Sequence, residues 1–274
     1  MIKDNVTIKC PPRVGIDPFA PVRLEKMRIE GIPEIPRVDV VAQCPDGPRW
    51  IATHSDSYLL VPNEEVVRIA EATLAEAGLS PRLVEVAWNG KKFGATYEIP
   101  GSSSELESQG VMFAVEAVNS YDGTLAFGIR FLARRLVCSN GLYFSKVLGS
   151  FSFKHLKANE WDISDAIKQL RDGAERFILL APYIRAMQDI PVDLRTVLEW
   201  HKTLTLSSPA WPDSKTGDVL AALRESGDRP TMWDLLNAFT FVTSHAMEPF
   251  SGARQSEKIC NFATAFVKGL GGGM

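Results

Sequence analysis

Basic side chains are concentrated in one segment of the chain, from Leu125 to Glu160. Six fall there against a single acid, Glu160, a local charge of +5 in a chain whose net charge is −3. These six residues are Arg130, Arg134, Arg135, Lys146, Lys154 and Lys157. Cations on one sheet face with aromatic residues close by are typical of a groove that follows the backbone of single-stranded nucleic acid. The plainer interpretation is a solvated basic face that pairs with acids such as Glu116.

Two further lysines and an aromatic residue extend this predicted surface. Lys91 and Lys92 fall at the tip of a predicted hairpin, next to Trp88. Stacking of a base on an aromatic ring is worth about 1–3 kcal/mol. We therefore include Trp88 as a stacking candidate, whereas Phe151 and Phe153 suit the core better than a stacking role.

An alternative set of residues could line a catalytic cleft between the sheet and the helices. It comprises His155, Cys138 and Asp122, with Arg134 beside them. Neighbouring arginines would lower the pKa of the Cys138 thiol if it were exposed. This set suits a small enzyme that acts on nucleotides or on a host metabolite. The plainer interpretations are a buried thiol, a turn-forming Asp122 before Gly123 and a strand-end histidine that hydrogen-bonds to the helical part.

Motifs for metals, cofactors and nucleophilic catalysis are absent from the sequence. The four histidines, His54, His155, His201 and His245, have no metal-ligand spacing. The four cysteines contain no CxxC pair, and the chain has neither a G-x-S-x-G elbow nor a glycine-rich phosphate loop. We therefore expect no metal, no cofactor and no ATP hydrolysis, and we favour a protein that is not an enzyme.

Two strands with period-two alternation must position the central arginines. Residues 111–118 and 125–132 each place apolar side chains at every second position, so one face of each strand packs in a core. A three-residue loop at 121–123 would pair Phe113 with Phe131. This loop requires a positive φ at its third residue, which is a glycine.

This register also places the charges. Arg130 and Arg134 leave the sheet on the face opposite the phenylalanines, and Glu116 lies diagonal to Arg130, within reach of an ion pair. A last strand is predicted around residues 150–155. The expected fold class is α+β, an antiparallel sheet built from hairpins with a helix packed on one face, followed by a helical C-terminal region.

A helix and a second hairpin precede these strands. The helix is predicted to begin at Asn63, as its N-cap, and to end at Gly78. The dipeptide at 89–90, Asn-Gly, predicts a type I′ turn that pairs Val86 with Phe93. Residues 101–109 are expected to form a loop rich in serine and glutamate.

The two ends of the chain differ in character. The first 49 residues hold eight of the seventeen prolines, so no long regular element is expected beyond a short strand at 38–42. Helical periodicity starts near residue 162, with a break expected at Pro182. Further helices are predicted at 192–206, 216–225, 231–247 and 253–270. The predicted domains are a proline-rich arm (1–49), an α+β sheet domain (50–158) and a helical region (159–274).

Composition limits the class of protein. Hydrophobic residues make up 45% and charged residues 23% of 274 residues, as in an ordinary globular protein. No apolar stretch approaches a membrane span, and the N-terminus lacks the apolar run of a signal peptide. Scattered thiols at Cys10, Cys44, Cys138 and Cys260 favour a reducing compartment. We therefore expect a cytoplasmic protein without a membrane partner.

Three segments carry a resemblance to a known family. They are Asn119-Ser120-Tyr121-Asp122-Gly123-Thr124, Arg135-Leu136-Val137-Cys138-Ser139-Asn140-Gly141 and Trp233-Asp234-Leu235-Leu236-Asn237-Ala238. In their order and spacing they resemble the phage/plasmid-like proteins classed as domain of unknown function 932. The resemblance covers the chain from about Tyr58 to its end. It implies a phage, plasmid or integrated element as the setting, and it implies no chemistry.

These observations favour a non-enzymatic protein that binds single-stranded DNA in replication or recombination, for example in strand annealing, as a homo-oligomer. The small enzyme described above is one alternative. A protein-interaction module that uses the proline-rich arm is another. The position of the Arg130–Lys157 charges, in one open groove or in internal ion pairs, distinguishes the first hypothesis from a plain folded domain.

Overall fold

The computed structural model describes residues 6–11, 14–28, 35–136, 141–144, 148–153, 155, 163–207 and 214–271. The protein is mixed α+β, as predicted, with two β-sheets and a helical C-terminal region. It divides into two compact units. Unit 1 comprises residues 1–99, 115–130 and 150–171, and unit 2 comprises residues 100–114, 131–149 and 172–274.

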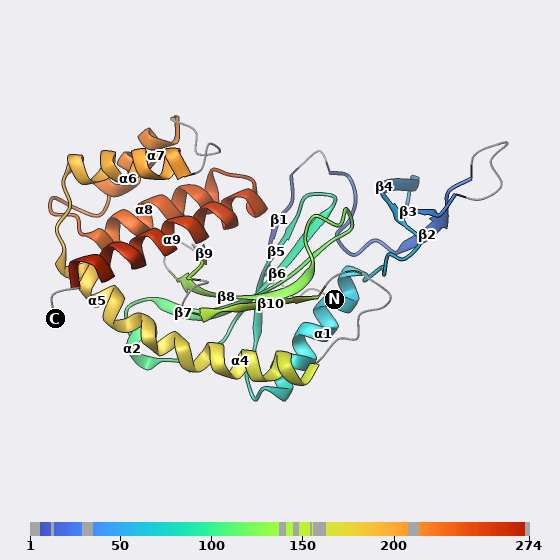
Figure 1. Cartoon of the computed structure of the whole chain (residues 1–274), viewed down its shortest axis with the longest axis horizontal. Coiled ribbons are helices and arrows are strands. Elements are labelled where there is room, and N and C mark those ends of the chain that lie inside the picture. The colour runs from blue at the N-terminus through green and yellow to red at the C-terminus, as the bar shows by residue number, and fades with distance from the viewer. Residues whose placement is uncertain are drawn as a thin grey trace. The chain divides into compact units, whose positions relative to one another are not determined.

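The larger sheet has the strand order β1-β5-β6-β7-β8-β10, with β9 paired to β8 (Figure 1). The bounds are β1 Thr7–Lys9, β5 Arg82–Trp88, β6 Lys92–Glu98, β7 Val111–Ser120, β8 Phe127–Arg135, β9 Gly141–Leu142 and β10 Ser150–Phe153. The pairs β5–β6, β8–β9 and β8–β10 are antiparallel, whereas β1 runs parallel to β5. Every residue of β7 is buried, so both faces of this strand are covered.

The β5–β6 hairpin forms where the sequence predicts it, but the predicted register is wrong. Val86 pairs with Ala95 instead of Phe93. The side-chain oxygen of Asn89 accepts from the two backbone N–H groups that follow Gly90, at 3.1 and 2.8 Å. This Asx-type bonding puts Asn89 ahead of the turn instead of inside it, and the pairing shifts accordingly.

The loop between β7 and β8 depends on the predicted glycine. Gly123 has a φ of 70°, as the sequence requires. The loop is longer than predicted, because the Ser120 hydroxyl donates to the Leu125 carbonyl and accepts from the Leu125 N–H, both at 2.9 Å. The rings of Phe113 and Phe131 lie 6.2 Å apart, in agreement with the predicted pairing.

The proline-rich segment holds more regular structure than predicted. A three-stranded antiparallel sheet is formed by β2 (Val22–Lys26), β3 (Arg37–Cys44) and β4 (Gly47–Ser55). The prolines near these strands stand where a missing N–H is tolerated. Pro45 lies in the turn between β3 and β4, and Pro48 lies on the edge strand β4.

Helix α1 (Asn63–Glu76) is held at both ends by residues distant in sequence. Its N-cap is Pro62, whereas the sequence predicted Asn63. The Asn63 N–H donates to the Tyr121 hydroxyl at 2.9 Å. At the other end, the Arg171 guanidinium donates to two carbonyls, at 2.9 and 3.3 Å. These bonds satisfy groups that every helix end leaves without intrahelical partners.

The C-terminal part is helical, as predicted. The helices are α4 Ile163–Phe177, α5 Ala181–Asp189, α6 Leu194–Ser207, α7 Ser214–Arg224, α8 Met232–His245 and α9 Pro249–Gly271. A 3₁₀ turn over Ile178–Leu180 interrupts the helical run just before Pro182, where the break was expected. In unit 2, α9 lies along α8, and α7 packs on α8 (Figure 1). A short helix, α2 (Ser104–Ser108), occupies the predicted serine-rich loop.

Candidate functional site

The arginines of β8 are engaged within the protein. The Arg130 guanidinium lies 3.6 Å from the Glu116 carboxylate, which is the predicted pair. Glu116 is buried, so this contact offsets part of the cost of burying its charge. Arg134 is 8% exposed and interacts with its neighbours. The guanidinium groups of Arg130 and Arg134 are therefore engaged in contacts within the protein.

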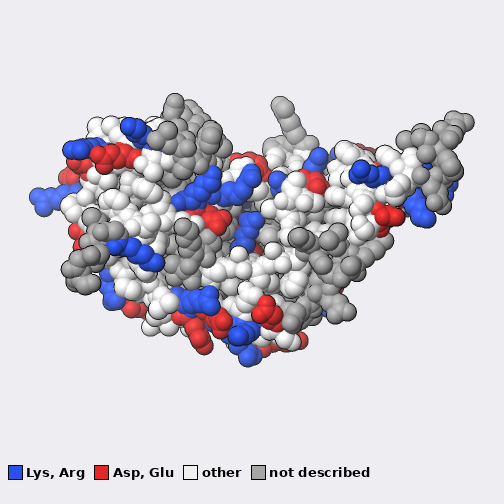
Figure 2. Space-filling model, viewed as in Figure 1, with Lys and Arg blue, Asp and Glu red and all other residues white. Residues whose placement is uncertain are grey.

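Several predicted cations cannot be placed. Lys146, Lys154 and Lys157 lie outside the described residues, and so does Cys138 of the predicted cleft. On the face shown in Figure 2, basic and acidic side chains are interspersed. A single open strip of cations therefore stays a prediction.

The lysine at the β5–β6 tip meets a different tryptophan from the one predicted. Trp88 is 1% exposed, and its indole N–H donates to the Ile16 carbonyl at 2.8 Å, so its ring belongs to the core. The Lys91 ammonium lies instead over the ring of Trp50, 5.7 Å from the ring centroid. Trp50 and Lys91 therefore form a contact between the two sheets of unit 1.

Trp50 is an exposed aromatic side chain with a fixed orientation. It lies on β4 and is 59% exposed. Its indole N–H is shared between the Asp39 carboxylate and the Thr53 hydroxyl, each at 3.2 Å. These bonds hold the plane of the ring while much of its surface faces solvent. Such a ring, with a cation beside it, can receive a second flat group by stacking.

His155 belongs to a stack of three rings in unit 1. Its centroid lies 5.4 Å from that of Tyr58, which lies 4.0 Å from that of His54. Its Nδ1 is 3.2 Å from the Leu59 carbonyl oxygen. Burial lowers the pKa of His155; the bond to Leu59 opposes this and His54 adds to it. A neutral imidazole therefore helps to join the strand end to the segment before α1.

Asp122 forms the turn after β7. One carboxylate oxygen accepts from the N–H and the hydroxyl of Thr124, at 3.0 and 2.6 Å. Burial raises the pKa of this carboxyl, but the bonds from Thr124 and the charge of Lys92 outweigh burial, and the pKa falls below its ordinary value. The carboxylate is therefore ionised near neutral pH and is occupied by its own loop.

The segment 119–124, which carries part of the family resemblance, has a structural explanation. Asn119 is fully buried, and its amide donates to the Val61 carbonyl and to Asn63 Oδ1, both at 2.9 Å. Tyr121 binds the N-terminus of α1, and the remaining members close the loop. This segment fixes α1 against β7 and needs no catalytic role to account for it.

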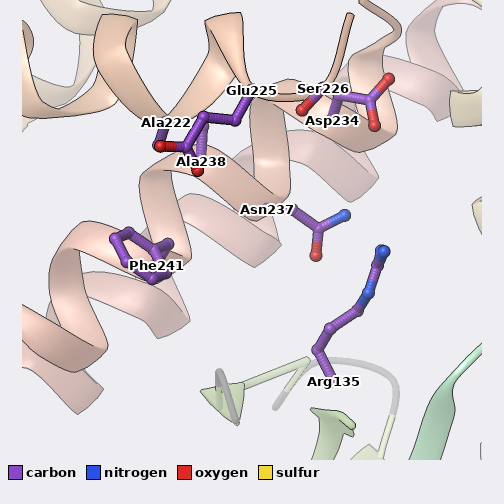
Figure 3. Close-up of a pocket in the computed structure, with 8 residues that line it drawn as sticks. All are labelled: Arg135, Ala222, Glu225, Ser226, Asp234, Asn237, Ala238 and Phe241. Carbon is purple, nitrogen blue, oxygen red and sulfur yellow. The ribbon is translucent and has the colours of Figure 1, made fainter. Parts of the chain in front are cut away.

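Unit 2 contains a pocket of about 400 Å³ (Figure 3). It is lined by Arg135, Ala222, Glu225, Ser226, Asp234, Asn237, Ala238 and Phe241. The four lining residues of α8 are spaced i, i+3, i+4 and i+7, so they share one face of the helix. The end of β8 and the end of α7 supply the rest. Arg135 and Asn237, from two segments that carry the resemblance, thus line one pocket.

Arg135 reaches this pocket from the end of β8. Its guanidinium lies over the ring of Trp233, 5.5 Å from the centroid. Its Nε and Nη1 are buried and have no hydrogen-bond acceptor among the residues that the structure describes. A buried donor without an acceptor costs about 1–3 kcal/mol. In Figure 3 the side chain points from β8 toward Asn237.

Two carboxylates also line the pocket. Asp234 accepts from the N–H and the hydroxyl of Thr231, both at 2.8 Å, in a capping box at the start of α8. Glu225 follows the last residue of α7 and is exposed. The pocket thus combines one cation with two acceptors and with the partly exposed ring of Phe241.

The described ranges hold neither a metal-binding cluster nor a membrane-spanning helix. Within them, no cluster of three or more histidine, cysteine, aspartate or glutamate residues is arranged to hold a metal ion. No helix in the described part of the chain has the length and apolar character needed to cross a membrane.

Similarity to known proteins agrees with the resemblance seen in the sequence. No curated protein and no solved structure matches the chain significantly. The model of one family, described as Domain of unknown function (DUF932), matches residues 51–264, which is most of the chain. The chain therefore belongs to the DUF932 family.

Proposed function

We propose that the protein binds single-stranded nucleic acid, with Trp50 as a stacking surface for a base and Lys91 as a contact for the adjoining phosphate. The observation that carries this proposal is the exposed, oriented indole with an ammonium group 5.7 Å from its centroid. Non-specific binders of single strands combine such rings with cations.

The charges around Trp50 limit how many phosphates this surface can neutralise. Arg23 pairs with Glu25 at 2.6 Å, and Arg49 pairs with Asp46. Lys91 is exposed at the hairpin tip. With one or two phosphates contacted, log K should fall with log salt with a slope of about −0.7 to −1.4. Binding of this kind is weak, and association of several copies along a strand would strengthen it.

The biological setting is part of the same proposal. The family resemblance suggests a phage or plasmid, where single strands arise during replication and recombination. Strand annealing by a homo-oligomer in the cytoplasm would use a weak, sequence-tolerant contact repeated on each copy.

A titration of labelled oligothymidylate, followed by fluorescence anisotropy at about 50 and about 200 mM salt, tests the proposal. Trp50→Ala should weaken binding about 5- to 150-fold, since base stacking is worth about 1–3 kcal/mol. Trp50→Phe keeps a ring and should retain most of the affinity.

A matched pair of lysine variants tests the phosphate contact. Lys91→Ala should reduce the salt slope by about 0.7. Lys202→Ala removes an exposed lysine of α6 in unit 2 and should leave the slope unchanged. Absence of binding by the wild type at low salt, or equal affinities of Trp50→Ala and wild type, would exclude this function.

A further inference from the structure

We propose that the pocket around Arg135 in unit 2 binds a small molecule that carries an oxyanion, a phosphate or a carboxylate, together with hydroxyl or amino groups. This inference does not rest on nucleic-acid binding, because the pocket residues belong to unit 2 and the Trp50 surface belongs to unit 1.

Arg135 accounts for the oxyanion. Trp233 holds the guanidinium from one side, and the buried Nε and Nη1 have no acceptor in the described part of the chain. A guanidinium in a partly enclosed site attracts an anion more strongly than one in bulk water, since the local dielectric constant is lower. Planar N–H donors match the oxygens of carboxylates and phosphates.

The acidic residues account for the other groups of the ligand. Asp234 and Glu225 can accept hydrogen bonds from hydroxyl or amino groups, and they disfavour a ligand that is anionic throughout. Asp234 is held in place by its bonds to Thr231, so its carboxylate is oriented before a ligand arrives. The ring of Phe241, 39% exposed, provides an apolar surface at the same pocket.

The size of the pocket limits the ligand. A volume of about 400 Å³ lies near the lower end of the range for small-molecule sites, about 300–1,000 Å³. Sugar phosphates, nucleoside monophosphates and small hydroxy or amino acids fit this class. A dinucleotide or a polymer segment exceeds it.

Thermal unfolding of the full chain with a defined set of compounds tests the proposal. The probes are ribose 5-phosphate, the nucleoside monophosphates, malate and glutamate, each matched with a partner that lacks the oxyanion, such as ribose or adenosine. At least one oxyanion probe should raise the Tm, whereas its matched partner should not. If no probe of the set raises the Tm, or if matched pairs act equally, the proposal is wrong.

Three variants connect binding to the pocket by titration calorimetry. Arg135→Gln should weaken the active probe about tenfold or more, because a charge-assisted hydrogen bond is lost. Ala222→Leu fills part of the pocket from α7, keeps every charge and should also weaken binding. This second variant shows whether weaker binding by Arg135→Gln reflects the pocket and not a folding defect. Arg229→Gln removes an exposed arginine of unit 2 and should bind as the wild type does. If both pocket variants bound the probe with the affinity of the wild type, the ligand would bind elsewhere and the inference would be wrong.

Discussion

Replacement of Asn119 tests whether the segment 119–124 is structural. Its buried amide donates to the Val61 carbonyl and to the side chain of Asn63, and so joins β7 to the start of α1. Asn119→Ala deletes both donors at once and leaves two acceptors of unit 1 without them. The variant should therefore be destabilised, although it changes no residue of the two proposed binding sites.

The size of this effect can be estimated from the hydrogen bonds. Each acceptor that loses its donor in a buried place costs about 1–3 kcal/mol, so two cost about 2–6 kcal/mol. Asn119 Oδ1 is itself buried with no donor among the described residues, and its removal relieves part of that cost. We therefore expect a value near the lower end of the range, about 2–3 kcal/mol. This is a large fraction of the 5–15 kcal/mol that is typical of whole domains.

Urea unfolding followed by far-UV circular dichroism measures this loss. With an m value of about 3 kcal/mol/M, the midpoint should fall by about 0.7–1 M. The matched control is Thr203→Ala, which removes a hydroxyl bond to the Glu199 carbonyl on an exposed face of α6. The control should change stability by at most about 0.5 kcal/mol. Equal midpoints for Asn119→Ala and Thr203→Ala would refute the structural explanation of the segment.

Three other substitutions have predicted effects on stability. Gly123→Ala should destabilise by about 1–2 kcal/mol, because φ is 70° and the new Cβ would lie 3.1 Å from His54 Cε1. By contrast, Gly217→Ala lies inside α7 with open space around it and should stabilise the protein by about 0.5–1 kcal/mol in the same urea assay. If both glycine variants changed the stability in the same direction, this explanation from backbone conformation would be wrong. The pKa of His155 is lowered in the folded protein, so the unfolded chain binds the proton more readily and stability should fall as pH drops below about 6.5. The Tm of His155→Gln should show a smaller decrease from pH 7.5 to pH 5.5 than the wild type, and parallel profiles would exclude His155 as the cause.

Elements with strong local signals could be predicted from the sequence. The positive φ at Gly123, the break before Pro182 and the α1 stop at Gly78 all follow from properties of single residues, and the structure contains each of them. The ion pair of Arg130 with Glu116 followed from strand alternation. Local chemistry decides such features, so no knowledge of the tertiary fold is needed.

Features set by side chains and by tertiary packing could not be predicted. The β5–β6 register depends on which N–H groups the Asn89 side chain binds, and a two-residue turn signal does not specify this. Trp88 lies in β5 and Trp50 in β4, and their sequence neighbours do not show that one is buried and the other exposed. Trp50 stands between Arg49 and Ile51, so its neighbours in the sequence carry no clear signal of exposure.

The candidate pocket shows the same limit. The spacing of Asp234, Asn237 and Phe241 indicates one face of a helix, but a helix face is more often core than a binding site. The convergence of α7, α8 and the end of β8 brings these residues into one pocket. The sequence predicted Arg135 as a nucleic-acid contact, whereas its place beside Trp233 could be seen only in the folded chain.

The arrangement at the two ends of α1 has a consequence for how the protein is made. The tyrosine that receives the first N–H of the helix is 58 positions downstream, and the arginine that binds its last carbonyls is 95 positions downstream. When α1 has just left the ribosome, the Asn63 N–H and the carbonyls of Glu76 and Ala77 therefore lack these distant partners and can bind only water. Stable docking of α1 must wait for translation of β7 and of α4 as far as Arg171, when residues 172–274, most of unit 2, are still to be synthesised.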